Sequence, residues 1–141
     1  MKSGFDYKEF KEWAKSIGVA KKEFHKWLED FLLQMGWRAY EKAVKRQQTY
    51  TYTNAKGEQK IGLIDTGTMI KSWYVSDIRW KGSYLEVEIG NNVEYASYIE
   101  YGQRSFQGAY LLTVAIDDIE REIPARFNKE WLLFLQSKGV V

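Results

Sequence analysis

Residues 85–102 read LEVEIGNNVEYASYIEYG, and this stretch decides the fold. Apolar Leu85, Val87 and Ile89 alternate with glutamates, which predicts a half-buried strand. A Gly-Asn-Asn turn ends the strand, and we expect a helix of about two turns that ends at Gly102, a residue suited to a left-handed cap. Because so short a helix is unstable alone in water, it must lie against the sheet or against a partner.

The composition predicts one domain over residues 1–141 and argues against several kinds of active site. The chain has no cysteine, which excludes disulfides and thiolate chemistry, and its single histidine makes a zinc site of His and Cys ligands hard to build. A Ser-His-Asp mechanism would have to use His25, which we interpret as an ordinary side chain on a helix. We therefore expect no catalytic, metal or cofactor site. No apolar run approaches about 20 residues, so we expect no membrane span.

Charge is distributed unevenly along the chain. Residues 1–81 hold 16 basic and 10 acidic side chains, residues 82–122 hold 2 and 8, and residues 123–141 hold 3 and 1. Solvated faces would explain this pattern. It would equally let opposite surfaces of neighbouring copies attract one another head to tail.

Helical periodicity dominates the N-terminal third of the chain. A short helix is expected within residues 1–18, after a capping sequence that starts at Asp6, and a longer one over 20–46. The longer helix carries two apolar stripes, so it either crosses the centre of the domain or turns one stripe toward another subunit. The first stripe is Phe24, Trp27, Leu28, Phe31, Met35 and Ala39, and the second is Leu33, Trp37, Tyr40 and Val44.

Two hairpins and a final helix complete the prediction. Residues 47–64 are expected to form a hairpin around Asn54–Gly57, and residues 72–89 a second one around Lys81-Gly82. The pattern is helical again over 109–136, where Pro124 should kink or break the helix. The fold class is therefore α+β: an antiparallel sheet of about four strands, packed by a long N-terminal helix and a Pro-broken C-terminal helix, with a short helix after the last strand.

The tripeptide Asp65-Thr66-Gly67 follows two apolar residues, as in the catalytic turn of retroviral-type aspartic proteases. Those enzymes pair two such aspartates across a dimer. They are almost wholly β, however, whereas about half of this chain has a helical pattern. A plainer interpretation is that Asp65 or Thr66 caps the next turn and Gly67 supplies tight backbone geometry.

Clustered charges offer two more candidate sites. The carboxylates of residues 117–122 converge poorly, because adjacent helical positions do not face one another, and Glu86 and Glu88 are expected on a solvated strand face. A small nucleic-acid-binding module would use Lys42, Lys45 and Arg46 near Tyr50 and Tyr52. A net charge of only +2 is low for a dedicated binder.

The order of these elements resembles the head–tail joining proteins (tail-completion, tail-terminator and neck proteins) of tailed double-stranded DNA bacteriophages and prophages. The Asp-Thr-Gly turn and the run from Gly90 to Gly102 carry the resemblance, which covers nearly the full length. The matching motif residues, expected to be structural, are Asp65, Thr66, Gly67, Gly90, Asn92, Glu94, Tyr95, Tyr98, Glu100 and Gly102.

The resemblance implies a virion protein that assembles in the host cytoplasm and has no cofactor. It implies a ring of copies, expected to be a hexamer, that caps the tail tube, meets the head connector and lets DNA pass without specific binding. A stopper-type neck protein nearer the portal is the close alternative. The candidate subunit interface consists of Trp37, Tyr40, Tyr50, Tyr52, Tyr95, Tyr98 and Tyr101.

The sequence departs from this pattern at the 47–64 hairpin. Relatives approach the Asp-Thr-Gly turn by a short Thr-Pro-Val-like link, whereas this chain inserts a hairpin there. We interpret the hairpin as an extension that reaches an adjacent subunit or another component of the particle.

Overall fold

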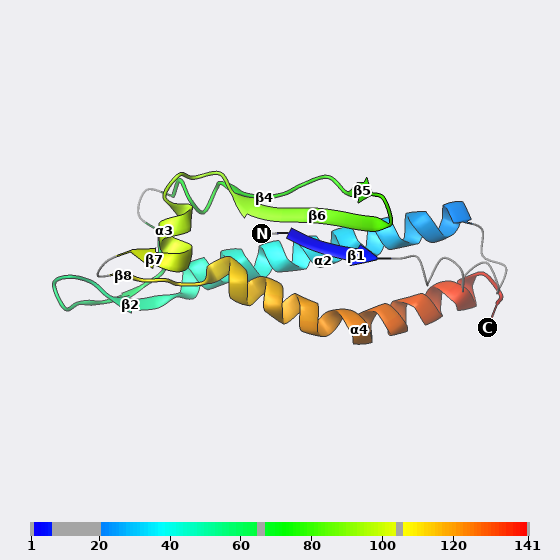
Figure 1. The fold of residues 1–141 in the computed structure, drawn as a ribbon. Coiled ribbons are helices and arrows are strands. Elements are labelled where there is room, and N and C mark those ends of the chain that lie inside the picture. The colour runs from blue at the N-terminus through cyan, green and yellow to red at the C-terminus, as the bar shows by residue number, and fades with distance from the viewer. Residues whose placement is uncertain (1, 7–20, 65–66, 104–105, 141) are drawn as a thin grey trace.

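The protein is described by a computed structural model that covers residues 2–6, 21–64, 67–103 and 106–140. Two long helices, α2 (Lys21–Thr49) and α4 (Leu111–Ser137), lie side by side along the molecule, and a small antiparallel sheet lies along them (Figure 1). The short helix α3 (Ala96–Tyr101) sits near the C-terminal end of α2. This arrangement confirms the α+β class and the short helix after the long strand.

The sheet is built around β6 (Tyr84–Asn91). On one edge β6 pairs with β1 (Lys2–Asp6), and on the other with β4 (Trp73–Val75) and β5 (Arg79–Lys81), always antiparallel. Alternation along β6 turns Leu85, Val87 and Ile89 into the core, as predicted. The second predicted hairpin is confirmed as β5–β6, and β4 continues it along the same edge.

Strand β1 was not predicted. Lys2–Asp6 fall in the 1–18 range given to the N-terminal helix but form a strand that pairs with β6. The helix expected after Asp6, and with it the proposed cap, lies outside the described residues. Five residues that contain a glycine carry too little alternation to indicate a strand on their own.

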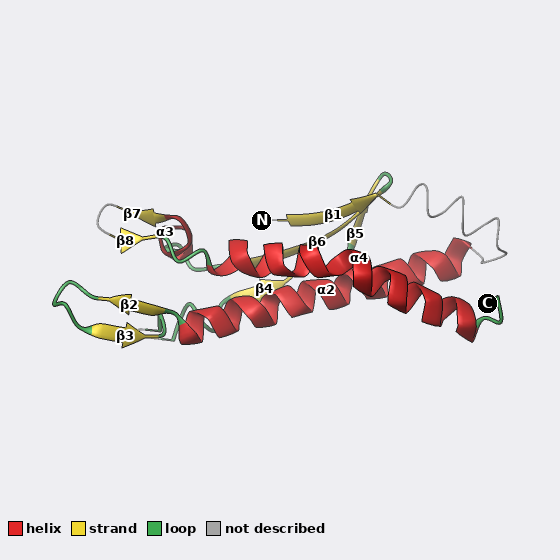
Figure 2. Cartoon of the chain, turned by 90° about the horizontal axis from the view of Figure 1, so that it is seen from below, coloured by secondary structure: helices red, strands yellow, loops and turns green. Residues whose placement is uncertain are grey.

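The two predicted hairpins do not share one sheet. Strands β2 (Thr51–Thr53) and β3 (Gln59–Ile61) form a separate two-stranded unit, called the arm below, with Thr51 opposite Ile61. The arm continues beyond the C-terminal end of α2, at the same end as α3 and the small β7–β8 pair (Gly102–Gln103 and Phe106–Gln107) (Figure 2). Its strands pair with each other and pack little on other described elements.

Helix α4 continues through Pro124 as one helix, so the predicted break does not occur. Its ribbon bends near the middle instead (Figure 1). Proline removes one main-chain hydrogen bond and costs about 3 kcal/mol in a helix interior. Burial offsets this cost, because Ile119, Phe127 and Trp131, on both sides of the proline, all pack into the core.

Aromatic rings from both helices interlock where the N-terminal half of α2 meets the C-terminal half of α4. The ring of Trp27 lies 4.9 Å from that of Trp131 and 5.1 Å from that of Phe127. Lys138 pairs with Glu23 at 3.4 Å where the C-terminal end of α4 meets the N-terminal end of α2.

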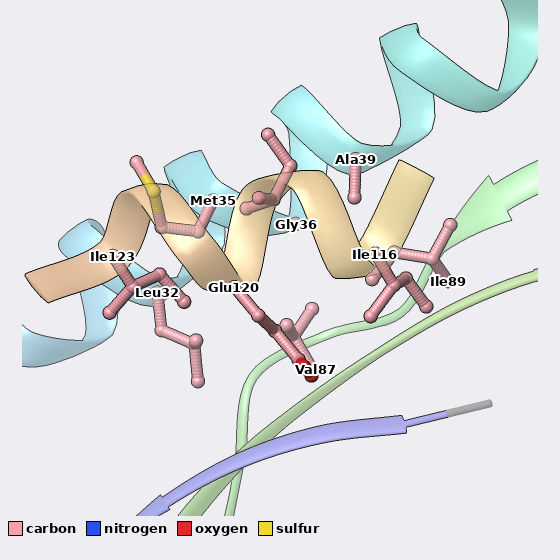
Figure 3. Close-up of a pocket in the computed structure, with 10 residues that line it drawn as sticks. Leu32, Met35, Gly36, Ala39, Val87, Ile89, Ile116, Glu120 and Ile123 are labelled. Atoms are coloured by element: carbon pink, nitrogen blue, oxygen red, sulfur yellow. The ribbon is translucent and has the colours of Figure 1, made fainter. Parts of the chain in front are cut away.

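The centre of the core is tightly packed. Leu32, Met35 and Gly36 of α2 meet β6 and α4 around a space of only 10 Å³ (Figure 3). A Cβ atom on Gly36 would lie 3.2 Å from Val87, so the absence of a side chain lets α2 approach the sheet closely. The space is at the lower limit for one water molecule, so it is too small to hold a ligand.

The second apolar stripe of α2 is only partly covered. Leu33, Tyr40 and Val44 are half-buried and Trp37 is 47% exposed, whereas most of the first stripe is buried. The described part of the chain therefore does not fully bury α2 on both sides.

Candidate interaction surfaces

Four exposed tyrosine side chains lie on and beside α3. Tyr95, Tyr98 and Tyr101 are exposed by 42%, 53% and 58%. Tyr110 joins them, since its ring packs edge-on against Tyr101 at 6.3 Å. We call these four residues the tyrosine surface. Tyrosine provides a large contact area at low entropic cost, and exposed tyrosines are enriched at protein interfaces.

A buried carboxylate holds this surface in place. Glu100 of α3 is only 7% exposed and accepts hydrogen bonds from the main-chain N–H groups of Leu112 (2.9 Å) and Thr113 (2.7 Å). It also accepts from the Thr113 hydroxyl at 2.7 Å. These donors belong to the first turn of α4, where an N–H otherwise has no partner and a negative charge is favoured. Since Tyr110 at the cap position makes no side-chain cap bond, Glu100 performs that role from another helix.

The backbone around α3 has two positions that favour glycine. Gly102 has a positive φ of 89°, as a glycine cap requires, but its ψ of 164° is not left-handed helical, so that detail of the prediction is wrong. The chain leaves α3 directly into β7 instead. A Cβ atom on Gly108 would lie 2.5 Å from the carbonyl oxygen of Glu100. Only glycine, which has no Cβ atom, avoids this clash. Main-chain bonds from Ala109 and Tyr110 to Ile99 and Glu100 complete this link.

The remaining motif residues have different environments. Gly67 has a φ of 82° and begins a turn, in agreement with the tight geometry predicted for it, whereas Asp65 and Thr66 lie outside the described residues. Gly90 lies beneath the Tyr74 ring, where a Cβ atom would come within 2.5 Å of the phenol oxygen. Asn92 and Glu94 are exposed.

Two amide side chains, buried Gln47 and half-buried Asn91, connect the elements around this site. Gln47, fully buried at the end of α2, donates to the Leu63 carbonyl at 2.9 Å and accepts from the Trp73 indole at 2.6 Å. Asn91 donates to the Met69 carbonyl at 2.8 Å and accepts from Val93 N–H at 3.0 Å. Between them these bonds join α2, β4, β6 and the segment after the arm.

The seven candidate interface residues fall into three groups, two of which meet at a groove lined by both Tyr52 and Tyr95. Tyr95, Tyr98 and Tyr101 belong to the tyrosine surface. Tyr50 and Tyr52 stack at 6.4 Å at the base of the arm, and Trp37 and Tyr40 contact edge-on at 5.2 Å on α2.

An open groove of about 570 Å³ separates the base of the arm from α3. Such a volume is typical of binding sites, and the lining is mainly apolar. Its walls include Tyr52, Leu63, Ile64, Met69, Tyr95 and Ile99.

The outer face of the sheet carries a network of charges. Glu86 pairs with Lys81 at 3.2 Å, and Glu88 pairs with Arg79 at 3.3 Å and accepts from the Tyr74 hydroxyl at 2.9 Å. Burial, followed by the bond to Glu88, raises the pKa of Tyr74. The predicted solvated face is wrong for Glu86, which is only 8% exposed, because the cations of β5 lie across it.

Two of the three basic residues proposed for nucleic-acid binding are engaged within the chain, and the third, Lys45, is exposed. Arg46 donates to the Ala109 carbonyl at 3.1 Å, and Lys42 lies 3.9 Å from Glu122. Arg38 donates to the same carboxylate at 2.5 Å and Arg126 at 3.3 Å. The hydrogen bond from Arg38, reinforced by its charge, lowers the pKa of Glu122.

The described residues contain no group of His, Cys, Asp and Glu side chains that would hold a metal ion. His25 is half-buried and packs on the Trp80 ring at 4.8 Å. No helix in the described ranges is long and apolar enough to cross a membrane. The features that dominate this end of the molecule are therefore the tyrosine surface and the groove.

Comparison with protein families decides the relationship. The sequence model described as "Bacteriophage HK97-gp10, putative tail-component" matches residues 11–102, about two thirds of the chain. The chain belongs to this HK97 gp10-like family. The match runs from residue 11 to Gly102 and so includes α2, the arm, the sheet strands β4, β5 and β6, and α3, but neither β1 nor α4. It confirms the resemblance to phage tail proteins and supports a structural role in the tail. Comparisons with curated proteins and with solved structures give no match.

Sequence reasoning missed three residues that organise the site of this HK97 gp10-like chain. Glu100 was named only as part of a motif, while Gln47 and Asn91 were not singled out. A glutamine such as Gln47 is an ordinary residue in the polar and apolar pattern of a helix, so the sequence does not mark it as buried. For Glu100, the signal lay in a pair of facts that are separate in sequence: an apolar helix start without a capping residue, and a carboxylate on the preceding short helix.

Proposed function

We propose that this protein forms a ring at the head-proximal end of a phage tail, where it terminates the tail tube and joins it to the head connector while DNA passes through. Family membership places the chain among tail components. The observation that carries the finer proposal is the tyrosine surface. Four exposed aromatic side chains stand on a helix that Glu100 fixes to α4, which is the design of a rigid docking surface.

Ring closure needs two different patches on each subunit. The tyrosine surface and the half-covered stripe of α2 provide apolar patches on different elements. A hexamer, contacts with the tail tube protein and the head connector, and a virion location after assembly in the host cytoplasm follow from the family resemblance. The role is structural and involves no substrate.

Passage of DNA favours a channel that does not bind phosphates strongly, because each phosphate contact adds salt-sensitive affinity. Lys42 and Arg46, which would bind phosphates, are already engaged by Glu122 and a main-chain carbonyl. Exposed Asp117 and Glu120 come from the acidic 82–122 segment, which we propose lines part of the channel.

Particle assembly without the protein tests this function. Phage produced without it should accumulate filled heads and separate tails, and purified wild-type protein added to that lysate should join them. A variant with Tyr98→Glu should fold, since Tyr98 is exposed, but should fail to join them. Deletion of residues 49–59 should likewise leave a folded monomer and block joining. Complete infectious particles formed without the protein would contradict the proposal.

A further inference from the structure

The arm carries an apolar side chain that its own chain leaves uncovered. Ile61 of β3 is 77% exposed, the highest value among the large hydrophobic residues that the structure describes as exposed. The arm is otherwise well formed. Asn54 accepts from the N–H groups of Lys56 and Glu58, and Gly62 N–H bonds to Tyr50 at its base. A two-stranded hairpin with both edges open is marginal in water, so its order at this position favours a role in contact with another surface.

The register of the arm determines which way Ile61 points. Thr51 lies opposite Ile61, and Tyr52 lies opposite Lys60. Opposite residues share a face of a hairpin and successive residues alternate between faces. Tyr52 lines the groove between the arm and α3, so Ile61 lies on the face turned away from that groove. The Ile61 side chain of one copy therefore cannot enter the groove of the same copy.

We propose that Ile61 of one copy inserts into the groove of a second copy of this chain, so that successive copies are joined arm to groove. An apolar projection and a complementary hollow elsewhere on the same molecule form a heterologous contact, which closes into a ring when the rotation allows it. The hollow offers Leu63, Met69 and Ile99 to an isoleucine. The inference deepens the proposed ring function and rests on it.

Charge favours a copy of this chain as the occupant. The arm carries Lys56, Glu58 and Lys60, and Glu58 pairs with Lys60 at 3.6 Å, which leaves the arm with one net positive charge. Exposed Glu94 directly precedes Tyr95, which lines the groove. Docking at Tyr95 therefore brings the net positive arm toward the carboxylate of Glu94.

Cysteine pairs test the contact directly, because the natural chain has no cysteine. Ile61→Cys and Tyr95→Cys are made as separate chains with tags of different size, mixed, and treated with a short bismaleimide. The expected product is the mixed covalent dimer, in excess of both homodimers. Leu133→Cys, exposed on the C-terminal part of α4, replaces Ile61→Cys in the control mixture. If the mixed dimer is no more abundant than in that control, the proposal is overturned. This holds even if the wild-type chain is monomeric in solution.

Self-association provides a second measurement. Ile61→Glu should weaken association in sedimentation equilibrium by about tenfold or more, while Leu133→Glu leaves it unchanged and both retain wild-type circular dichroism. Equal association of Ile61→Glu and wild type overturns the proposal. The location of the protein in the particle is measured separately. Cross-linking without a virion location would refute the proposed function alone, and a virion location without cross-linking would refute the arm-to-groove contact alone.

Discussion

Replacing Glu100 by alanine removes the carboxylate that caps α4 from α3. The change deletes three hydrogen bonds of 2.7–2.9 Å and leaves the buried Leu112 N–H without its acceptor. A hydrogen bond to a charged group contributes about 1.5–3 kcal/mol, and loss of a helix cap costs about 0.5–2 kcal/mol. These contributions overlap, and water replaces part of the bond to the hydroxyl of Thr113. We therefore expect the free energy of unfolding to fall by about 3 kcal/mol.

Urea unfolding followed by tryptophan fluorescence measures this loss. With a slope of about 2 kcal/mol/M, the midpoint should fall by about 1.5 M without a change in slope. Glu100→Gln retains one carbonyl acceptor and should lose about half as much. Glu94→Ala removes an exposed carboxylate nearby and should stay within about 0.5 kcal/mol of wild type. A Glu100→Ala protein as stable as Glu94→Ala would refute the idea that this carboxylate fixes α3 to α4.

Three further changes probe the supports of the site. Gln47→Leu leaves the Trp73 indole and a main-chain carbonyl unpaired in the interior and should cost about 3 kcal/mol in urea unfolding. Gly108→Ala forces a methyl group against a main-chain carbonyl of α3 and should cost about 1–3 kcal/mol, which a thermal melt would register. The hydrogen bond from Arg38 lowers the pKa of Glu122, so its stabilising effect is present above the unfolded pKa and is lost as the pH falls through the folded pKa. The stability difference between wild type and Glu122→Gln should therefore shrink as the pH falls from neutral to well below the ordinary pKa of a glutamate, and a difference that stays constant over this titration would contradict the assignment.

The parts of the fold that local pattern specifies were predictable. The first stripe of α2 and the alternation of Leu85, Val87 and Ile89 placed the main helix and the central strand, because a buried face imposes its own period on the sequence. The turn chemistry of Asn54–Gly57 likewise identified the arm.

Features that depend on distant partners were not predictable from one sequence. Strand β1 exists because β6 offers it an edge, about 80 residues further along the chain. Nothing local separates the arm from the main sheet, and the path of α4 through Pro124 depends on Phe127 and Trp131 packing against α2. The cap by Glu100 joins residues that are 12 and 13 positions apart, beyond the reach of any helix-capping pattern.

The position of the protein in the intact particle tests the central claim most directly. Electron microscopy of phage that carries a gold-labelled tag on this chain should show label only at the junction of head and tail, and averaging of that region should reveal a closed ring of copies around an open channel. Label along the tail shaft or at its distal tip, or particles that contain none of the protein, would contradict the account.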